Sequence, residues 1–304
     1  MNNNSRNRIP KPPWLRRRLA DKLEFGRVRS LMKECSLHTV CESARCPNIW
    51  ECFSRKTATF LIMGNRCTRN CRFCAIEPGP LGLPDPEEAF HVAEAVDKMG
   101  LAHAVITSVT RDDLPDFGVS CFVKTVQEIR KRSRGITIEV LVPDFCGNKE
   151  AIASLIEARP DVIAHNMETV PGLYPHVRPQ AVYEISLALL RQVSESGRDI
   201  FVKSGMMLGL GETEDEIIRT LDDLLFSGCR ILTLGQYLQP TASHIPVERF
   251  LPPEEFQSWQ EKATAMGFQQ VVSGPFVRSS YHAGSLFRAM QSSGKRPGPD
   301  QDPE

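Results

Sequence analysis

Short runs of apolar and β-branched residues alternate with amphipathic segments along most of the chain beyond residue 55. Such runs are typical of buried strands, and apolar residues repeated every three or four positions indicate helices that pack on one face. The pattern predicts strands at Thr59–Met63, Ala104–Val109, Ile136–Val142, Val162–His165, Ile200–Ser204 and Ile231–Gln236. It predicts helices at about Pro86–Met99, Val119–Arg132, Lys149–Glu157, Ala181–Ser196, Glu214–Phe226 and Pro253–Met266.

Local signals mark the starts of several of these helices. Thr213 and Glu216 have the spacing of a capping box, and Pro86 and Pro253 stand where helices begin. Strands that alternate with helices at this interval predict βαβ units and a parallel sheet. Six units are too few for a closed eight-stranded barrel, and no G-x-G-x-x-G follows the first strand as in a doubly wound dinucleotide fold. We therefore predict an α/β fold, a partial (β/α)6 barrel of the TIM type.

The barrel is predicted to occupy residues 55–275 without an internal boundary. A cysteine-rich extension, 1–54, precedes it, and a C-terminal extension, 276–304, follows it. In parallel α/β folds the active site gathers at the C-terminal ends of the strands. This rule brings six segments to one mouth of the barrel, namely Cys67–Cys74, Ser108–Arg111, Pro143–Asp144, Asn166–Glu168, Met206–Glu212 and Tyr237–Gln239.

Composition and charge exclude some classes of partner. The chain of 304 residues is 41% hydrophobic and 24% charged, as in ordinary globular proteins, and its formal net charge is zero. No global field therefore favours nucleic acid, and no apolar run is long enough to span a membrane. Prolines interrupt the basic N-terminal segment, so we predict a flexible cytosolic arm rather than a mitochondrial transit peptide, and a cytoplasmic protein. Residues 294–304 are predicted to form a disordered tail.

Six of the ten cysteines fall between Cys41 and Cys74. In a chain without an export signal, this clustering indicates metal binding rather than a disulfide framework. Cys67, Cys71 and Cys74 form a C-x3-C-x2-C pattern after the first barrel strand. Three thiolates can hold three irons of a cubane and leave the fourth iron open to a small molecule. Structural zinc instead requires four ligands, usually in two pairs, and no fourth Cys or His lies near at the usual spacing.

A second trio, Cys41, Cys46 and Cys52, has a spacing unlike that of zinc knuckles. It also offers only three thiolates, so the fourth ligand of a second cluster must come from elsewhere in the chain. The segment Arg278–Ala283 contains two serines and a tyrosine shortly after Gly274 and Pro275. By composition alone it would be an ordinary surface turn.

The first pattern resembles the radical S-adenosylmethionine (SAM) superfamily, whose C-x3-C-x-aromatic-C motif is matched by Cys67, Cys71, Phe73 and Cys74. The resemblance implies a [4Fe–4S] cluster whose open iron binds the amino and carboxylate groups of SAM. One electron then cleaves SAM to methionine and a 5′-deoxyadenosyl radical. A glycine-rich strand end beside the methionine moiety is also typical of the superfamily, and the candidates are Gly209, Gly211 and Glu212.

The two cysteine patterns together, followed by R-S-S-Y, resemble the lipoyl synthase family. Matching segments run across nearly the whole chain, namely KPPWL (11–15), TSVTRDDLPD (107–116), HNMETV (165–170), LYPHVRP (173–179), KSGMMLGLGE (203–212), LTLGQYLQP (232–240) and MGF (266–268). Trp50 and Phe117 depart from the family pattern, since glycine is expected at both positions.

This resemblance implies the insertion of two sulfur atoms at C6 and C8 of an octanoyl chain bound to a lysine of a protein, with one SAM consumed for each. It implies that a second [4Fe–4S] cluster, on Cys41, Cys46, Cys52 and Ser280, donates the sulfur. The implied partners are octanoylated lipoyl domains of 2-oxoacid dehydrogenase E2 subunits and the H protein of glycine cleavage. An electron donor of the ferredoxin or flavodoxin type and a cluster-repair carrier are implied as well.

Other residues have more than one interpretation. Phe73 of the motif is assigned to the SAM site. Asn166 and Glu168 at a strand end are assigned to it as well, although they could equally cap the following segment. Lys203 is assigned with them and could pair with a carboxylate, the alternative being a surface lysine with its charge in water. Arg178 is interpreted as a residue that steers an acidic partner domain.

Three rival classes are a radical SAM methylthiotransferase, an iron–sulfur electron carrier and a zinc-stabilised binding protein. The first usually has a separate N-terminal cysteine domain and a C-terminal nucleic-acid-binding module, and neither is evident in this sequence. The second would need closed four-cysteine sites and no large barrel. The third would contain zinc and no acid-labile sulfide.

Overall fold

The computed structural model describes residues 10–16, 22–35, 37–54 and 58–292 of the chain. Its centre is an eight-stranded sheet in the order β1-β2-β5-β6-β7-β8-β9-β10. All neighbours from β2 to β10 are parallel, and β1 pairs with β2 in the antiparallel sense. The strands are β1 (His38–Thr39), β2 (Thr59–Ile62), β5 (His103–Ser108), β6 (Thr137–Leu141), β7 (Val162–Ala164), β8 (Phe201–Leu208), β9 (Ile231–Gln236) and β10 (Gln270–Gly274).

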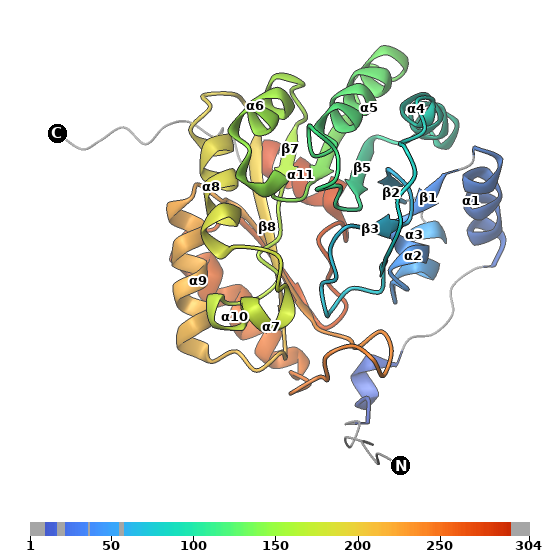
Figure 1. Cartoon of the computed structure of the whole chain (residues 1–304). Helices are drawn as coiled ribbons and strands as arrows, with labels where there is room; N and C mark the ends of the chain where they lie inside the picture. Colours follow the sequence, from blue (N-terminus) through green and yellow to red (C-terminus); the bar gives the residue numbers. More distant parts are fainter. Residues whose placement is uncertain (1–9, 17–21, 36, 55–57, 293–304) are drawn as a thin grey trace.

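Helices that connect consecutive parallel strands cover the outer face of the curved sheet (Figure 1). They are α4 (Glu88–Met99), α5 (Val119–Arg132), α6 (Lys149–Glu157), α8 (Tyr183–Ser194), α9 (Glu214–Phe226) and α10 (Pro253–Met266). The predicted partial barrel is confirmed, and so is the capping box of Thr213 and Glu216 at the start of α9. The structure adds β10 as a seventh parallel strand, which was not predicted because all of its residues are only half-buried.

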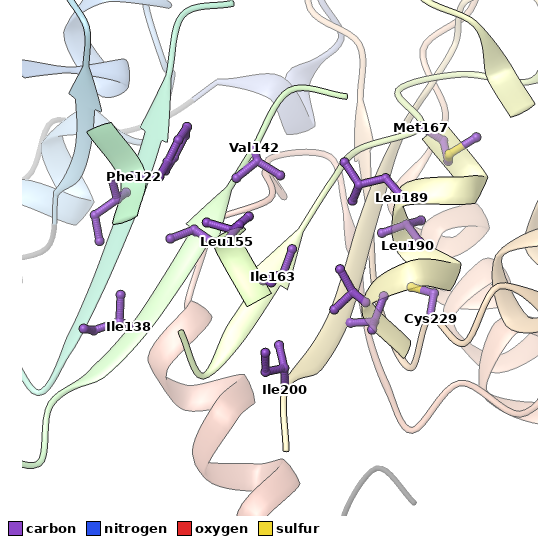
Figure 2. Close-up of a cluster of buried hydrophobic side chains, with 14 of the residues drawn as sticks. Phe122, Ile138, Val142, Leu155, Ile163, Met167, Leu189, Leu190, Ile200 and Cys229 are labelled. Atoms are coloured by element: carbon purple, nitrogen blue, oxygen red, sulfur yellow. The ribbon is translucent and has the colours of Figure 1, made fainter. Parts of the chain in front are cut away.

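The main core lies between the sheet and these helices. Because strand side chains alternate between the two faces, Ile138 and Ile163 point outward to the helices while Glu139 points into the barrel. Figure 2 shows Ile138 and Ile163 among side chains of the covering helices, including Leu155, Leu189 and Leu190. Each fully buried side chain of this size contributes about 1.5–3 kcal/mol to folding.

A second, smaller apolar group closes the barrel interior at the strand starts. It is formed where α11 (Ala283–Ser292) lies inside the curved sheet (Figure 1). Phe287 of this helix packs edge-on against Phe201, with ring centroids 5.6 Å apart. The members of the group are Val162, Phe201, Ile231, Phe287 and Met290. The interior is therefore filled at one end and approached from the other.

The N-terminal extension forms a layer beside β2. It contains α1 (Lys22–Glu34), α2 (Val40–Ser43) and α3 (Ile49–Ser54), and the short η1 (Pro13–Leu15) precedes it in the chain. Trp50, which replaces an expected glycine, stacks on Phe25 of α1 with ring centroids 4.0 Å apart. The departure from the family pattern thus supplies a contact between α1 and α3. The predicted tail and most of the predicted arm lie outside the described residues. Among the described residues, no helix is long and apolar enough to cross a membrane.

Short elements complete the mouth of the barrel. The pair β3 (Arg66–Cys67) and β4 (Glu77–Pro78) folds the cysteine loop back on itself. The remaining elements are η2 (Phe145–Gly147), η3 (Pro171–Leu173) and α7 (Tyr174–Val177).

Candidate active site

The cysteine loop of residues 67–74 lies at the mouth of the barrel, directly after β2. The sulfur of Cys67 accepts hydrogen bonds from the backbone N–H groups of Arg69 and Thr110, at 3.4 and 3.3 Å. Burial raises the pKa of Cys71 to about 11 and that of Cys74 to about 12, and the nearby sulfur of Cys67 acts in the same direction. The three thiols are therefore neighbours, and binding a metal would require them to lose their protons.

In the described part of the chain, no three His, Cys, Asp or Glu side chains converge as the ligands of one metal ion. Thiolates that each bind a different iron of a cubane lie farther apart than ligands of a single ion. Three sulfur donors on one loop are chemically suited to three irons of a cubane, which leaves the fourth iron open. The assignment of Cys67, Cys71 and Cys74 to such a cluster stays a prediction.

Arg69, between the first two cysteines, fastens this loop to two neighbouring strand ends. Its guanidinium donates to Asp112 at 2.7 and 3.0 Å and to Asp144 at 2.7 and 2.6 Å. Burial alone would raise the pKa of Asp144, but the hydrogen bonds from Arg69 hold that pKa below its ordinary value. The residue was missed in the sequence because its two partners follow 43 and 75 positions later.

The loop after β9 closes over the other side of the cysteine loop. His244 Nε2 lies 2.8 Å from the carbonyl oxygen of Cys74, and the N–H of Ile245 donates to the carbonyl of Arg72 at 3.3 Å. An open pocket of about 880 Å³ lies between the two loops, with Cys71 and Cys74 in its wall. Phe73 packs nearby in an apolar group that also contains Val177, Leu210, Tyr237 and Ile245.

Asn166 and Glu168 meet at the end of β7. The Asn166 amide donates to Glu168 Oε1 at 2.9 Å and to Ser279 Oγ at 2.6 Å, while its own buried Oδ1 has no hydrogen-bond partner. Glu168 has a φ of 66°, a strained value for a residue other than glycine. Burial raises its pKa, and the positive charges of Arg178 and Arg278 oppose that rise.

The glycine-rich turn after β8 is built for close approach. Gly209 and Gly211 have φ values of 97° and 109°, and a Cβ on Gly209 would lie 2.3 Å from the carbonyl oxygen of Arg249. The Glu212 carboxylate accepts from the N–H groups of Gly209 and Leu210, at 2.5 and 2.9 Å. Glu212 thus stabilises the turn that contains the two glycines.

Two sequence interpretations need correction. Lys203 is only 1% exposed and pairs with Glu139 at 2.7 Å near the strand starts, because its side chain points into the barrel. The structure therefore does not bring it to the mouth with the other predicted SAM contacts. Arg178 is buried and donates to the backbone carbonyls of Asn166 and Met167, so it cannot steer a partner from the surface.

The second cysteine trio lies in the N-terminal layer. Cys46 and Cys52 pack against an apolar group that includes Cys41 and Phe53. Burial raises the pKa of Cys41 to about 12, the nearby sulfur of Cys46 adds to the rise, and a hydrogen bond with Thr59 opposes it. The three cysteines thus lie in or against one apolar group.

Ser280 reaches the same place from the far end of the chain. The hydroxyl of Thr59 donates to Ser280 Oγ at 2.8 Å, although the two residues are 221 positions apart. The neighbouring Tyr281 donates to Glu51 at 3.1 Å, and Asn48 donates to the carbonyl of Phe276 at 2.7 Å. The segment is therefore not an ordinary surface turn but is bound to the N-terminal layer.

Comparison with known proteins agrees with this geometry. A model of the radical SAM superfamily matches residues 61–224, more than half of the chain. Among solved structures, methylornithine synthase (PylB) has a TM-score of 0.52 at 15% identity and covers 91% of this chain and 95% of its own. HydG, a maturase of the [FeFe]-hydrogenase, has a TM-score of 0.55 at 13% identity over 91% of this chain and 80% of its own. At these identities the likeness supports the barrel alone, and the match of the family model defines the class, a radical SAM enzyme.

Curated relatives narrow the class further. The lipoyl synthase of Desulfotalea psychrophila is 54% identical over 288 residues, which cover 95% of this chain and 96% of that protein. The lipoyl synthase of Caldanaerobacter subterraneus is 54% identical over 275 residues, or 90% of this chain and 96% of that protein. The chain belongs to the lipoyl synthase family.

Proposed function

We propose that this protein inserts two sulfur atoms, at C6 and C8, into an octanoyl chain carried on a lysine of an acceptor protein. Membership of the lipoyl synthase family supports the reaction. The single observation that carries it is the meeting of Ser280 with Cys41 through Thr59, beside a separate three-cysteine loop. An enzyme that only cleaved SAM would have no need of a second set of ligands.

The first site supplies the reactivity. Cys67, Cys71 and Cys74 would hold a [4Fe–4S] cluster, which with bound SAM provides a radical able to take hydrogen from an unactivated carbon. The residues of the mouth would orient SAM, with the free oxygen of Asn166, the carboxylate of Glu168 and the turn from Gly209 to Glu212 as its contacts. The apolar group around Phe73 would exclude water from the reacting carbon.

The second site supplies the sulfur. We assign Cys41, Cys46, Cys52 and Ser280 as ligands of an auxiliary [4Fe–4S] cluster that is dismantled in turnover. An oxygen ligand suits iron–sulfur chemistry less well than a thiolate, so Ser280 would be the ligand most readily released. Of the two adjacent serines, the contact with Thr59 favours Ser280, because Ser279 faces Asn166.

These contacts support the proposed division of the chain into domains. Residues 55–275 would form the radical-generating barrel, and the extensions 1–54 and 276–304 would together build the sulfur-donor site. The proposed partners are octanoylated lipoyl domains of 2-oxoacid dehydrogenase E2 subunits and the glycine cleavage H protein, with a ferredoxin- or flavodoxin-type donor and a cluster-repair carrier. All ten cysteines are free thiols, as is usual for a protein in a reducing compartment. A cytoplasmic location is therefore part of the proposal.

The test is anaerobic reconstitution with iron and sulfide, followed by reaction with SAM, dithionite and an octanoylated lipoyl-domain peptide. We expect 5′-deoxyadenosine and a mass gain of two sulfur atoms on the peptide. A Cys46→Ala variant should still cleave SAM but insert no sulfur, whereas Cys121→Ala, outside both trios, should insert sulfur as the wild type does. Formation of 5′-deoxyadenosine by the wild type without any sulfur on the peptide would contradict the proposal.

A further inference from the structure

The segment 277–282 connects β10 to α11, and its successive side chains contact different parts of the molecule. The charge of Arg278 acts on Glu168 at the end of β7, and the next three residues make hydrogen bonds. The bonds are Asn166 Nδ2 to Ser279 Oγ at 2.6 Å, Thr59 Oγ1 to Ser280 Oγ at 2.8 Å, and Tyr281 OH to Glu51 Oε1 at 3.1 Å. Two adjacent serines therefore face the two different sites.

Two strand glycines make room for this segment inside the barrel. A Cβ on Gly235 of β9 would lie 2.1 Å from the carbonyl oxygen of Val277, far inside contact distance. A Cβ on Gly205 of β8 would lie 2.5 Å from Thr233 Oγ1, and also 3.0 Å from Asn166 Oδ1 and 3.2 Å from Ser279 Oγ. The close approach of Ser279 to Asn166 thus depends on the absence of side chains at these positions.

We propose that Ser279 is a positioning residue, which fixes the spacing and orientation of the SAM site relative to the sulfur-donor site. The inference rests on the proposed function. A substrate carbon must lie next to SAM when its hydrogen is removed, and next to a sulfur atom of the second cluster when the C–S bond forms. Reactions of this kind tolerate errors in the carbon position of well under about 1 Å. Ser279 lies between the two sites. Its hydroxyl accepts a hydrogen bond from Asn166 at the end of β7, and the next residue in the chain is the proposed ligand Ser280.

Ser279 also fixes the orientation of the Asn166 amide. With the nitrogen of Asn166 donating to Ser279 and Glu168, its buried oxygen is the atom left to meet a ligand. Without the serine hydroxyl, one N–H loses its acceptor and the amide is free to turn over. The expected defect is a SAM contact that is misplaced relative to the sulfur-donor site, while the ligands of both clusters are unchanged.

The test compares Ser279→Ala with the wild type, with Ser279→Thr, which keeps the hydroxyl, and with Ser285→Ala, an exposed serine of α11. We expect the Ala variant to bind as much iron and sulfide as the wild type and to cleave SAM. The ratio of 5′-deoxyadenosine formed to sulfur inserted should rise about threefold to tenfold, because radicals are quenched when the carbon is misplaced. The Thr variant and the Ser285 control should keep the wild-type ratio.

A second readout needs no cluster. In the metal-free protein, amide hydrogen exchange of residues 277–282 should be faster in Ser279→Ala than in the wild type, with unchanged exchange in β5 and β6. An unchanged ratio and unchanged exchange would overturn the proposal, and so would loss of iron from the second site, which would make Ser279 itself a ligand. Failure of the wild type to insert any sulfur would instead count against the proposed function, while the exchange result would still test the contact.

Discussion

Arg69 shows how one side chain determines the shape of the cysteine loop. Its guanidinium is 5% exposed and is shared between Asp112 and Asp144, so both carboxylates depend on it for neutralisation. The loop between Cys67 and Cys71 thereby becomes part of the rigid strand ends. Removing one partner of a buried ion pair leaves the other charge uncompensated, which costs more than losing an exposed pair.

Arg69→Gln is expected to lower the free energy of unfolding of the metal-free protein by about 3–5 kcal/mol. The iron content of the first site should fall as well, because the loop loses its anchor. Urea denaturation and iron analysis measure the two effects. The matched control is Arg198→Gln, which breaks the exposed pair with Glu157 and should cost less than about 1 kcal/mol. Equal losses in both variants would contradict the anchoring role.

His165 makes the stability depend on pH. It is fully buried, with Nδ1 2.8 Å from the carbonyl oxygen of Val142 and Nε2 2.9 Å from Ser186 Oγ. Burial, helped by the charge of Arg178, lowers the pKa of His165 from 6.5 to about 4. A lowered pKa means that the unfolded chain binds the proton first, so this contribution to stability is complete above pH 6.5 and is lost as pH falls towards 4.

We expect the free energy of unfolding to decrease by on the order of 3 kcal/mol over this interval, at about 1.4 kcal/mol per pH unit. Urea denaturation from about pH 7.5 to about pH 3.5, which brackets the loss between 6.5 and about 4, measures the slope. His165→Gln should be less stable at neutral pH but should show a smaller slope, whereas His38→Gln, at an exposed position, should keep the wild-type slope. A slope unaffected by His165→Gln would assign the effect to other groups.

At the scale of elements, the glycine turn after β8 is where local conformation and site geometry depend on each other. Gly209 needs a positive φ, and its missing Cβ leaves room for the backbone at Arg249 and the side chain of Gln236. Because one of these neighbours is a main-chain carbonyl, the turn cannot absorb a methyl group by moving a flexible side chain. A substitution here must shift the turn itself.

Gly209→Ala is expected to cost about 1–3 kcal/mol from the strained φ alone, with a further loss from the overlap. It should also weaken SAM binding to the reconstituted protein about tenfold, a loss typical of a displaced contact group. Equilibrium dialysis and urea denaturation separate the two effects. Gly82→Ala is the matched control, since a Cβ there meets nothing within 4 Å. Unchanged SAM binding in Gly209→Ala would remove this turn from the proposed cofactor site.

The elements themselves could be predicted to different degrees. The bounds of α5, α6, α9 and α10 agree with the prediction, because each has an apolar face. Helices α6, α9 and α10 also have recognisable starts, at Asn148, Thr213 and Pro253. Strand β8 continues to Leu208, four residues beyond its predicted end, since its glycine and methionines have no β-branched signature. Phe117 occupies a left-handed position, with φ of 56°, where the family resemblance predicts glycine. No local pattern in the sequence indicates that a phenylalanine adopts this conformation.

At the scale of the whole molecule, the proposed second site depends on contact between the N-terminal layer and the segment after β10. Residue spacing predicted the three cysteines, but the proposed fourth ligand came from the family resemblance, since no periodicity relates Thr59 to Ser280. For the same reason Ser279 and Arg69 could not be identified in the sequence: their partners lie far along the chain. The order of the strands in the sheet brings such distant residues together, and a local sequence pattern does not encode that order.

Helix α11 is the element that holds the C-terminal end in place. It begins at Ala283, directly after the segment that contains Ser279 and Ser280, and its Phe287 fills the barrel interior against Phe201 and His103. The fixed position of the two serines therefore depends on a ring buried at the opposite end of the barrel. Weakening that anchor should loosen the segment before it disturbs the rest of the sheet.

Phe287→Ala is expected to lower the free energy of unfolding by about 3–5 kcal/mol, because the cavity left against Phe201 cannot fully collapse. Amide hydrogen exchange should accelerate more in residues 277–292 than in β5–β8, and sulfur insertion should fall more than SAM cleavage. The matched control is Phe226→Ala on α9, whose ring is 79% exposed and whose loss should cost about 0.5 kcal/mol or less. Acceleration spread evenly over the whole sheet would mean that α11 stabilises the barrel as a unit and does not specifically anchor the serine segment.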